Sequence, residues 1–216
     1  MLLNLRRSIV LAVFALAVTF IYALLGTGVS QLFFKSTADG SITANGSTLV
    51  GQNWAATPCP GHPLGSCVFQ GRPDALGPYA GSSSPPAGGG NNPLQANNIP
   101  DKPGVLNNGE SGATNLGPRS QTLLDNTRKL VAYWEARGVN PTPDLVTTSG
   151  SGLDPDITPQ DAMAEIPMVS RATGIAPSRL RSLINQNTQG RQLGFLGSPF
   201  VNVLQLNDAL AKLTAA

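Results

Sequence analysis

The sequence is poor in the side chains that most enzymes use. Of its 216 residues one is a histidine, His62, two are cysteines, and only 12% are charged, against about 25% in an ordinary soluble domain. A single histidine in a Pro/Gly loop, with no G-x-S-x-G motif, argues against a Ser-His-Asp hydrolase. The absence of a Gly-Lys pair excludes a P-loop. The sequence therefore indicates no catalytic residues of its own.

The sequence also argues against nucleic acid as a partner and against a metal site. The net charge is +2 and the arginines are scattered, so no nucleic acid is expected as a partner. Asp154, Asp156 and Thr158 have the spacing of the start of a calcium loop. However, Pro159 stands where that motif requires glycine and no matched glutamate follows. No zinc pattern is present, and we expect no metal site.

What the sequence does have is a long apolar run near its N-terminus. Residues 9–25 are interrupted only by Thr19 and Tyr22. As a helix this run is about 26 Å long, and residues 26–29 bring it to the ~30 Å of a bilayer core. The predicted anchor, residues 9–29, includes Ile9, Ala12, Ala15, Phe20 and Leu25. Small residues within it allow close approach of another helix.

The flanks of this run predict its orientation. Arg6 and Arg7 precede it, and the first charge after it is Lys35. By the positive-inside rule, residues 1–8 form a cytoplasmic tip and residues 30–216 lie outside the cell membrane. A cleaved signal peptide is the alternative. Its apolar core usually has 7–15 residues and a small-x-small cleavage site follows it, which makes a retained anchor the better interpretation.

Residues 144–161 are the stretch on which we base the domain. Residues 144–148 predict a short strand, and Ser149, Gly150, Ser151 and Gly152 predict a tight turn. Thr158 is a helix N-cap with Pro159 at the first helical position. A loop of this kind can present N–H groups to an anion. From the residues alone, a sharp turn capped by aspartates is the favoured alternative.

Helices and strands alternate after residue 120. Residues 120–137 predict an amphipathic helix that Gly138 stops. Pro167 is expected to kink or end the helix that begins at Pro159, and Pro177 opens another. Residues 200–204 predict a strand on which Val201 and Val203 share a face, and residues 205–213 a last helix. The prediction is one small α/β domain behind a single anchor.

Three features between the anchor and the helix predicted at residues 120–137 remain open to more than one interpretation. Cys59 and Cys67 suit a small disulfide loop in an oxidising compartment, with free thiols as the alternative. Arg72 precedes Pro73 and is therefore expected in extended backbone. Its side chain is either available to pair with a carboxylate or bind an anion, or is an ordinary surface arginine. Residues 81–109 are of low complexity and predict a long flexible insertion.

Several motifs together resemble one family. In order they are NGSTLVGQ at 45–52, Arg72-Pro73, SGATNLGP at 111–118, SGSGLDPDITP at 149–159, GRQLGFLG at 190–197 and VNVLQLN at 201–207. Their order and spacing resemble the C subunit of the Kdp-type potassium-transporting ATPase. The cysteine loop and residues 81–109 do not resemble the family pattern.

The resemblance implies an accessory, non-catalytic subunit. It implies assembly with a channel-like potassium-binding subunit and a P-type ATP-hydrolysing subunit, where ATP and K⁺ act at the level of the complex and no cofactor is bound covalently. Family members look like catalytic chaperones that raise the affinity of the pump for ATP. Positions implied in nucleotide or partner contact are Ser111, Gly112, Thr114, Asn115, Ser149, Gly150, Ser151, Gly152, Asp154, Arg72 and Arg191.

Two departures and one conflict limit what can be carried over. Ala113 replaces a family glycine, and Asp156 stands where the family usually has histidine. If the domain lies outside, Ser111 and Ser149 cannot touch cytoplasmic ATP. We therefore expect an effect on ATP affinity through linkage rather than contact. The alternative is a free-standing, membrane-anchored extracytoplasmic binding protein that uses residues 149–156 as its ligand site.

Overall fold

The computed structural model describes residues 2–52, 54–73 and 113–214. The chain divides into two compact units, Met1–Ile42 and Thr43–Ala216, and each is described by itself. The predicted insertion at residues 81–109 lies outside the described residues, as do Ser111 and Gly112.

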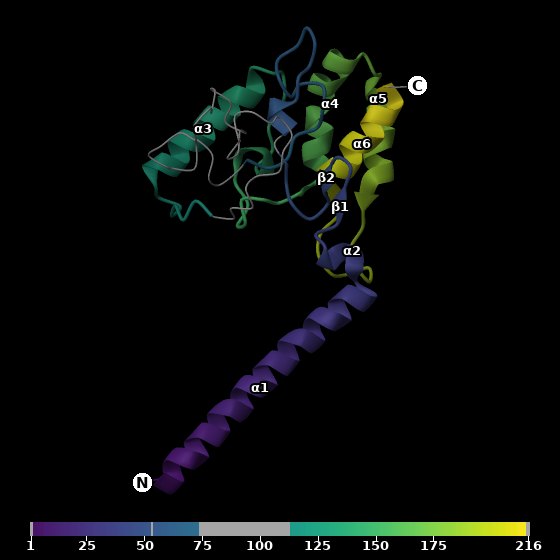
Figure 1. Ribbon diagram of the computed structural model, residues 1–216. Helices are drawn as coiled ribbons and strands as arrows, with labels where there is room; N and C mark the ends of the chain where they lie inside the picture. Colours follow the sequence, from purple (N-terminus) through teal and green to yellow (C-terminus); the bar gives the residue numbers. More distant parts are fainter. Residues whose placement is uncertain (1, 53, 74–112, 215–216) are drawn as a thin grey trace. The chain divides into compact units, whose positions relative to one another are not determined.

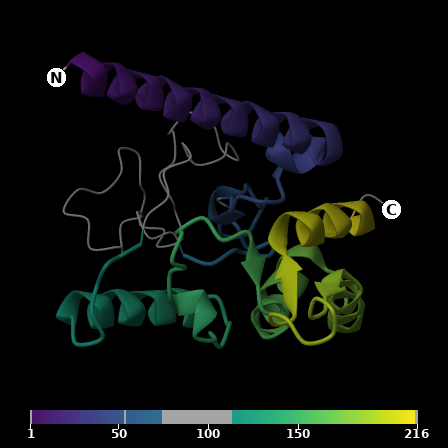
Figure 2. The ribbon, with the colours of Figure 1, turned by 90° about the horizontal axis from the view of Figure 1, so that it is seen from below.

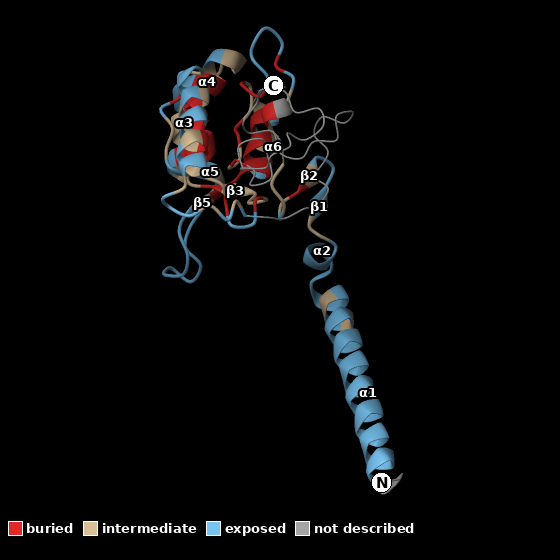
Figure 3. Ribbon diagram, turned by 90° about the vertical axis from the view of Figure 1, so that its left-hand side faces the viewer, coloured by how far each residue is buried: buried red, intermediate tan, exposed pale blue. Residues whose placement is uncertain are grey.

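The first unit is a long apolar helix, α1 (Leu2–Phe33), followed by the short helix α2 (Lys35–Ala38). Within α1, Asn4–Phe33 has a mean hydropathy of 2.6 and is long and apolar enough to cross a membrane. From Asn4 to Phe33 its residues are exposed, apart from Gly28 and Ser30, which are of intermediate burial (Figure 3). The hydroxyls of Thr19, Thr27 and Ser30 donate to carbonyls one turn earlier, at 2.9 Å. Internal pairing of this kind is what a helix surrounded by lipid requires.

The second unit is a small helix and sheet domain, as the sequence predicts. Helix α5 contacts both α4 and α6, and all three contact the strand β5, while α3 lies to one side of this group (Figures 1 and 2). Its elements are β1 (Ile42–Thr43), β2 (Gly46–Ser47), η1 (Trp54–Ala56), α3 (Gln121–Glu135), η2 (Asp144–Val146), β3 (Asp156–Ile157), α4 (Pro159–Thr173), α5 (Pro177–Asn187), β4 (Thr188–Gln189), β5 (Phe200–Asn202) and α6 (Val203–Thr214).

The larger sheet has three short strands in the order β3–β5–β4, all antiparallel. Asp156 pairs with Asn202 and Ile157 with Val201, while Thr188 pairs with Val201 on the other side. β5 is the central strand of this sheet, and α6 begins at the residue that follows it. The loop that ends at Asp156 is thereby fixed beside the start of α6.

The core forms where the predicted apolar faces of the helices meet. Trp134 on α3 is fully buried, and its indole N–H donates to the carbonyl of Leu145 at 2.9 Å. The apolar faces of these helices are buried: Leu130 and Trp134 on α3, Leu180, Leu183 and Ile184 on α5, and Leu206 and Leu210 on α6. In Figure 3 the buried residues gather on α4 and α6.

The predicted helix ends are confirmed. Ser120 caps α3 by accepting the N–H of Leu123 at 3.4 Å, and Gly138 beyond its end has φ +69°. Thr158 caps α4, with Pro159 in the first turn, and the Asp161 side chain completes a capping box. The residues of a cap lie close together in the chain, so local chemistry alone specifies it.

The predicted strand at residues 144–148 is wrong. Asp144–Val146 form a single 3-10 turn, after which Thr147 is extended. Pro143 has helical angles, the Thr147 hydroxyl donates back to its carbonyl at 2.8 Å, and the Leu145 carbonyl accepts from Trp134. These contacts outweigh the β-propensity of Leu145 and Val146, which depends on packing context.

Two smaller expectations also fail. Helix α4 continues past Pro167 to Thr173, because burial of Ile166, Met168 and Val169 holds the helix in spite of the missing N–H. The predicted strand at residues 200–204 ends at Asn202, and Val203 begins α6 with its N–H donating to Pro155 at 3.0 Å. Val201 and Val203 are both buried, but they do not share a strand face.

Candidate functional site

Arg72 lies between two carboxylates. Its Nη2 is 3.7 Å from Oδ1 of Asp144, and its Nη1 is 3.7 Å from Oδ2 of Asp154. Nη2 also donates to the carbonyl of Thr148 at 3.1 Å. The three charged side chains are between 22% and 35% exposed, so solvent screens part of their attraction. We call Arg72, Asp144 and Asp154 the Arg72 clamp, because they join the segments before and after the turn at Ser149.

The turn at residues 149–152, the Ser149 turn, uses its polar groups internally. The Ser149 hydroxyl accepts the N–H of Gly152 at 2.9 Å, and the Ser151 hydroxyl accepts that of Leu153 at 3.1 Å. Gly152 has φ +70°, a conformation that side chains disfavour. Nothing lies within 4 Å of a Cβ built on Gly150. The N–H groups of Gly152 and Leu153 are therefore occupied by the hydroxyls of the turn itself.

The residues that follow the turn are held by neighbouring segments. The Leu153 carbonyl accepts the N–H of Gly51 at 2.8 Å, and a Cβ on Gly51 would lie 2.7 Å from the Asp154 carbonyl oxygen. The Asp156 carboxylate accepts from the Asn202 amide at 2.8 Å. Burial raises the pKa of Asp156, and the hydrogen bond from Asn202 opposes that rise. Three of the motifs, at 45–52, 149–159 and 201–207, thus meet here.

A buried carboxyl group supports the segment that carries Arg72. Glu165 of α4 is fully buried, and its Oε2 accepts the N–H of Gln70 at 2.9 Å. Its Oε1 has no hydrogen-bond partner among the described residues. Burial raises the pKa of Glu165 well above the ordinary value, and the charge of nearby Asp161 adds to the rise. This environment favours the protonated form of Glu165 over the carboxylate.

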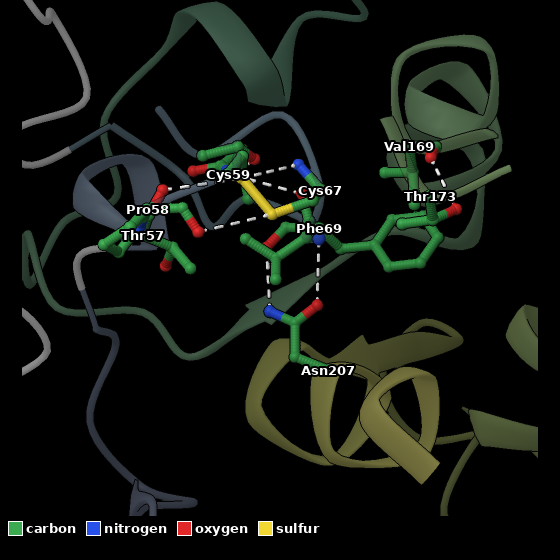
Figure 4. Close-up of a disulfide and its surroundings, with 11 residues drawn as sticks. Thr57, Pro58, Cys59, Cys67, Phe69, Val169, Thr173 and Asn207 are labelled. Atoms are coloured by element: carbon green, nitrogen blue, oxygen red, sulfur yellow. Dashed lines mark hydrogen bonds between the residues drawn. A yellow bond between two sulfur atoms is a disulfide. The ribbon is translucent and has the colours of Figure 1, made fainter. Parts of the chain in front are cut away.

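The predicted disulfide is confirmed, and it lies next to a pair of hydrogen bonds between Asn207 and the backbone of Phe69 (Figure 4). Cys59 and Cys67 are bonded, with Cα atoms 5.7 Å apart. Two residues later, the backbone N–H of Phe69 donates to the Asn207 side chain at 2.8 Å, and the Asn207 amide donates back to the Phe69 carbonyl at 2.9 Å. Asn207 of α6 therefore pairs with the chain as a neighbouring strand would. This pairing positions the approach to Arg72.

The structure brings only some of the predicted site residues together. Arg72 and Asp154 lie beside the Ser149 turn. Thr114 and Asn115 hydrogen-bond within their own turn, to Leu116 at 3.4 Å and to Ala113 at 3.2 Å. Within the described ranges, no hydrogen bond or ion pair joins these two residues to the Arg72 clamp. Any nucleotide or partner contact through them remains a prediction.

Arg191 lies in a different environment, at the start of an exposed loop that we call the Arg191 loop (residues 191–196). A backbone bridge from Gln192 to Leu196 closes it. Its apolar side chains face solvent: Leu193 is 83% exposed, Phe195 69% and Leu196 47%. Leu193 also has φ +52°, which is unfavourable for a branched residue. The loop thus exposes apolar groups on a constrained backbone.

Sequence reasoning missed Glu165 and Asn207, although each carries a signal. Glu165 falls at a helical spacing among Ala162, Ile166 and Val169, all buried, which places its carboxyl on the inner face of α4. Asn207 lies between Leu206 and Leu210 on the buried face of α6. A polar residue within an apolar stripe indicates a buried partner.

Comparison with known proteins gives one consistent result. The family model described as "KdpC: K+-transporting ATPase, c chain" matches residues 5–212. The chain is 38% identical to the potassium-transporting ATPase KdpC subunit of Methylorubrum extorquens, over 99% of this chain and 98% of that one. It is 36% identical to that of Bradyrhizobium diazoefficiens over the whole of both chains. A third relative, from Koribacter versatilis, is 38% identical over 87% of this chain and 82% of the relative. The chain therefore belongs to the KdpC family.

Proposed function

We propose that this chain holds together the potassium-selective and ATP-hydrolysing subunits of a high-affinity, ATP-driven potassium importer. As a KdpC family member it is an accessory subunit of a potassium transport complex. The observation that carries the finer proposal is a contrast within the chain. The charged groups of the Arg72 clamp pair with one another, whereas the apolar surfaces of α1 and of the Arg191 loop are exposed. Such a chain is suited to assembly rather than to bond-making chemistry.

In the proposed topology α1 spans the cell membrane with its N-terminus in the cytoplasm. Arg6 and Arg7 precede the apolar run, and Lys35 is the first charge after it, which favours a cytoplasmic N-terminus. The bond between Cys59 and Cys67 gives independent support, because disulfides persist mainly in oxidising, extracytoplasmic compartments. The domain after residue 30 would then face the outside.

An external domain acts on ATP affinity through linkage in this proposal. If the domain and α1 bind one state of the pump more tightly than another, they shift the pump toward that state and change its apparent affinity for ATP without touching the nucleotide. The internal hydrogen bonds of Gly152 and Leu153 agree with this view, since those N–H groups already have acceptors. Direct ATP contact would require the opposite topology.

Two surfaces would make the contacts. Ala12, Ala15, Gly26 and Gly28 on α1 are small, and nothing lies within 4 Å of a Cβ built on either glycine. Small residues allow the close helix approach on which association in lipid depends. On the domain, the Arg191 loop would bind the outer surface of the channel-like potassium-binding subunit. Burial there would remove its exposed apolar side chains from water.

The test is a mild-detergent pull-down of the tagged chain from potassium-starved cells, with an assay for potassium-stimulated ATPase activity. We expect a large P-type ATPase chain and a polytopic channel-like chain to co-purify in a fixed ratio with that activity. A second sample replaces residues 9–29 by a polyleucine helix of the same length, keeping Arg6 and Arg7. It should still insert in the membrane but lose the partner chains.

Two results would contradict the proposal. Recovery of the native chain alone, without ATPase activity, would favour a free-standing binding protein that uses residues 149–156. Full assembly with the polyleucine anchor would show that α1 does nothing but tether the domain.

A further inference from the structure

A cleft of about 280 Å³ opens on the domain between the disulfide loop and the ends of α3 and α4. Its polar lining consists of His62, Ser66, Arg137 and Arg171, and its other lining residues are apolar. None of the lining residues carries a carboxylate. The cleft belongs neither to the Arg72 clamp nor to the Arg191 loop, and the family motifs do not include its arginines.

Arg137 follows the end of α3 and is held by Tyr133. Its guanidinium carbon lies 3.6 Å from the centre of the Tyr133 ring, a cation–π contact. Its Nη1 donates to the Tyr133 carbonyl at 3.2 Å, while its buried Nε has no partner among the described residues. An arginine has five N–H donors. Most of those of Arg137 are therefore not used by the residues that the structure describes.

Arg171, in the last turn of α4, is held by two carbonyls. Its Nε donates to Pro167 at 3.2 Å, and its Nη2 donates to Arg137. The backbone of one arginine thus fixes the side chain of the other. Within the described ranges neither guanidinium forms an ion pair, in contrast to Arg72 and Arg128. Two cations held by hydrogen bonds thus line the cleft, and no described carboxylate pairs with either.

His62 and Ser66 lie in the loop that the disulfide closes. The N–H of His62 donates to the Cys59 carbonyl at 3.0 Å, and that of Ser66 to Pro63 at 3.1 Å. The bond between Cys59 and Cys67 constrains this loop further. His62 and Ser66 therefore line the cleft from a constrained backbone, and their side chains are further polar groups beside the two arginines.

We propose that this cleft is an anion-binding site for a phosphate group. Adjacent like charges repel, and a phosphate placed between the two arginines would turn that repulsion into attraction. Guanidinium groups match the oxygens of phosphate through paired N–H donors. An inorganic phosphate ion and the headgroup of an anionic phospholipid present the same chemistry, and the two arms of the test separate them. The inference is independent of the proposed function.

His62 supplies a direct reporter, because it is the only histidine in the chain. The full-length protein, carrying a histidine-free tag, is placed in nanodiscs of phosphatidylcholine, and the ring signals of His62 are followed by NMR at constant pH. Inorganic phosphate is titrated against chloride of equal ionic strength. We expect a saturable shift with phosphate alone. In a second arm the nanodiscs contain phosphatidylglycerol and no phosphate is added.

The key variant is Arg171→Gln, because Arg171 is exposed and its loss leaves the Tyr133–Arg137 stack in place. It should weaken binding by about tenfold or more, since a charge-assisted pair is lost. The double variant Arg137→Gln/Arg171→Gln should abolish saturation. Arg179→Gln on α5 removes the same charge from an exposed site outside the cleft and should bind as the native chain does.

Each outcome decides the matter. An arginine-dependent shift with inorganic phosphate identifies a free anion as the ligand. An arginine-dependent shift only in phosphatidylglycerol nanodiscs identifies the headgroup. No shift in either arm, or an equal shift in Arg171→Gln, would overturn the proposal, even if the double variant fails to fold.

Discussion

Two glycine-containing loops of the domain differ in what their side chains contact. In residues 149–156 the polar groups have partners: Ser149 caps Gly152, Asp154 pairs with Arg72, and Asp156 accepts from Asn202. In the Arg191 loop the closing contacts are backbone hydrogen bonds, and Leu193 and Phe195 face solvent.

The difference separates groups that stabilise the fold from groups that are available to a partner. Removing the hydrogen-bond partner of a buried polar group lowers the free energy of unfolding. Replacing an apolar side chain that is already exposed to water changes the free energy of unfolding little. The first loop should therefore respond to mutation through stability and the second through assembly. The predictions below follow the expected change in the free energy of unfolding, from largest to smallest.

The largest loss is expected for Asn207→Leu, which removes both hydrogen bonds to the buried backbone of Phe69. Two orphaned backbone groups should lower the free energy of unfolding by about 3 kcal/mol. Urea denaturation of the full-length chain in non-ionic micelles, followed by the fluorescence of buried Trp134, measures it. Asn185→Leu, at an exposed site on α5, is the matched control. Equal stability of the two variants would show that Asn207 does not hold the segment before Arg72.

The second prediction compares two arginines, one in each region. Arg72→Ala leaves Asp144 and Asp154 without a cation and the Thr148 carbonyl without a donor. We expect a loss of about 2 kcal/mol, limited by the partial exposure of the three charges. Arg191→Ala should change stability by less than about 0.5 kcal/mol. The same denaturation measurement tests both, and similar losses would remove the distinction between the two loops.

The third prediction concerns pH. Burial raises the folded-state pKa of Glu165 well above the ordinary value, so the folded protein binds a proton that the unfolded chain releases. That contribution is fully present below the unfolded pKa, about 4.3 for glutamate, and is lost as pH rises through the folded pKa. Glu165→Gln keeps the shape without the ionisation. The native chain should therefore lose stability relative to the variant as pH rises from 5 to 8.

Parallel urea denaturation curves at several pH values provide the measurement. A constant difference between Glu165→Gln and the native chain across this range would mean that Glu165 is ionised when folded. The buried Glu165 carboxylate would then need a counter-charge, which no described residue within ion-pair distance supplies.

Sequence alone predicted the parts of this fold that depend on local chemistry. The cap formed by Thr158 and Asp161 and the inner face of α5 at Leu180 and Ile184 can be derived from spacing. The strand expected at residues 144–148 failed because the Leu145 carbonyl is used by Trp134 of another element. No local pattern contains that contact.

The candidate site follows the same rule. Pro73 indicated an extended Arg72 whose side chain would pair or bind an anion, but not its partners, because Thr148 lies 76 residues further along the chain. The disulfide was predictable because its cysteines are eight residues apart. The cleft lined by Arg137 and Arg171 was not, since their elements meet only in the folded domain.

The smallest change in stability is expected where the functional change is greatest. The double variant Leu193→Ser/Phe195→Ser replaces side chains that are 83% and 69% exposed, so the free energy of unfolding should move by less than about 0.5 kcal/mol. If the Arg191 loop binds the potassium-binding subunit, co-purification of that subunit should nonetheless fall severalfold, because the apolar contact area is lost. Leu124→Ser, at a 44% exposed site on α3, should change neither quantity. Normal assembly with the double variant would move the docking surface elsewhere on the domain or to α1. A large loss of stability would instead show that the loop is part of the fold, and the contrast with residues 149–156 would no longer hold.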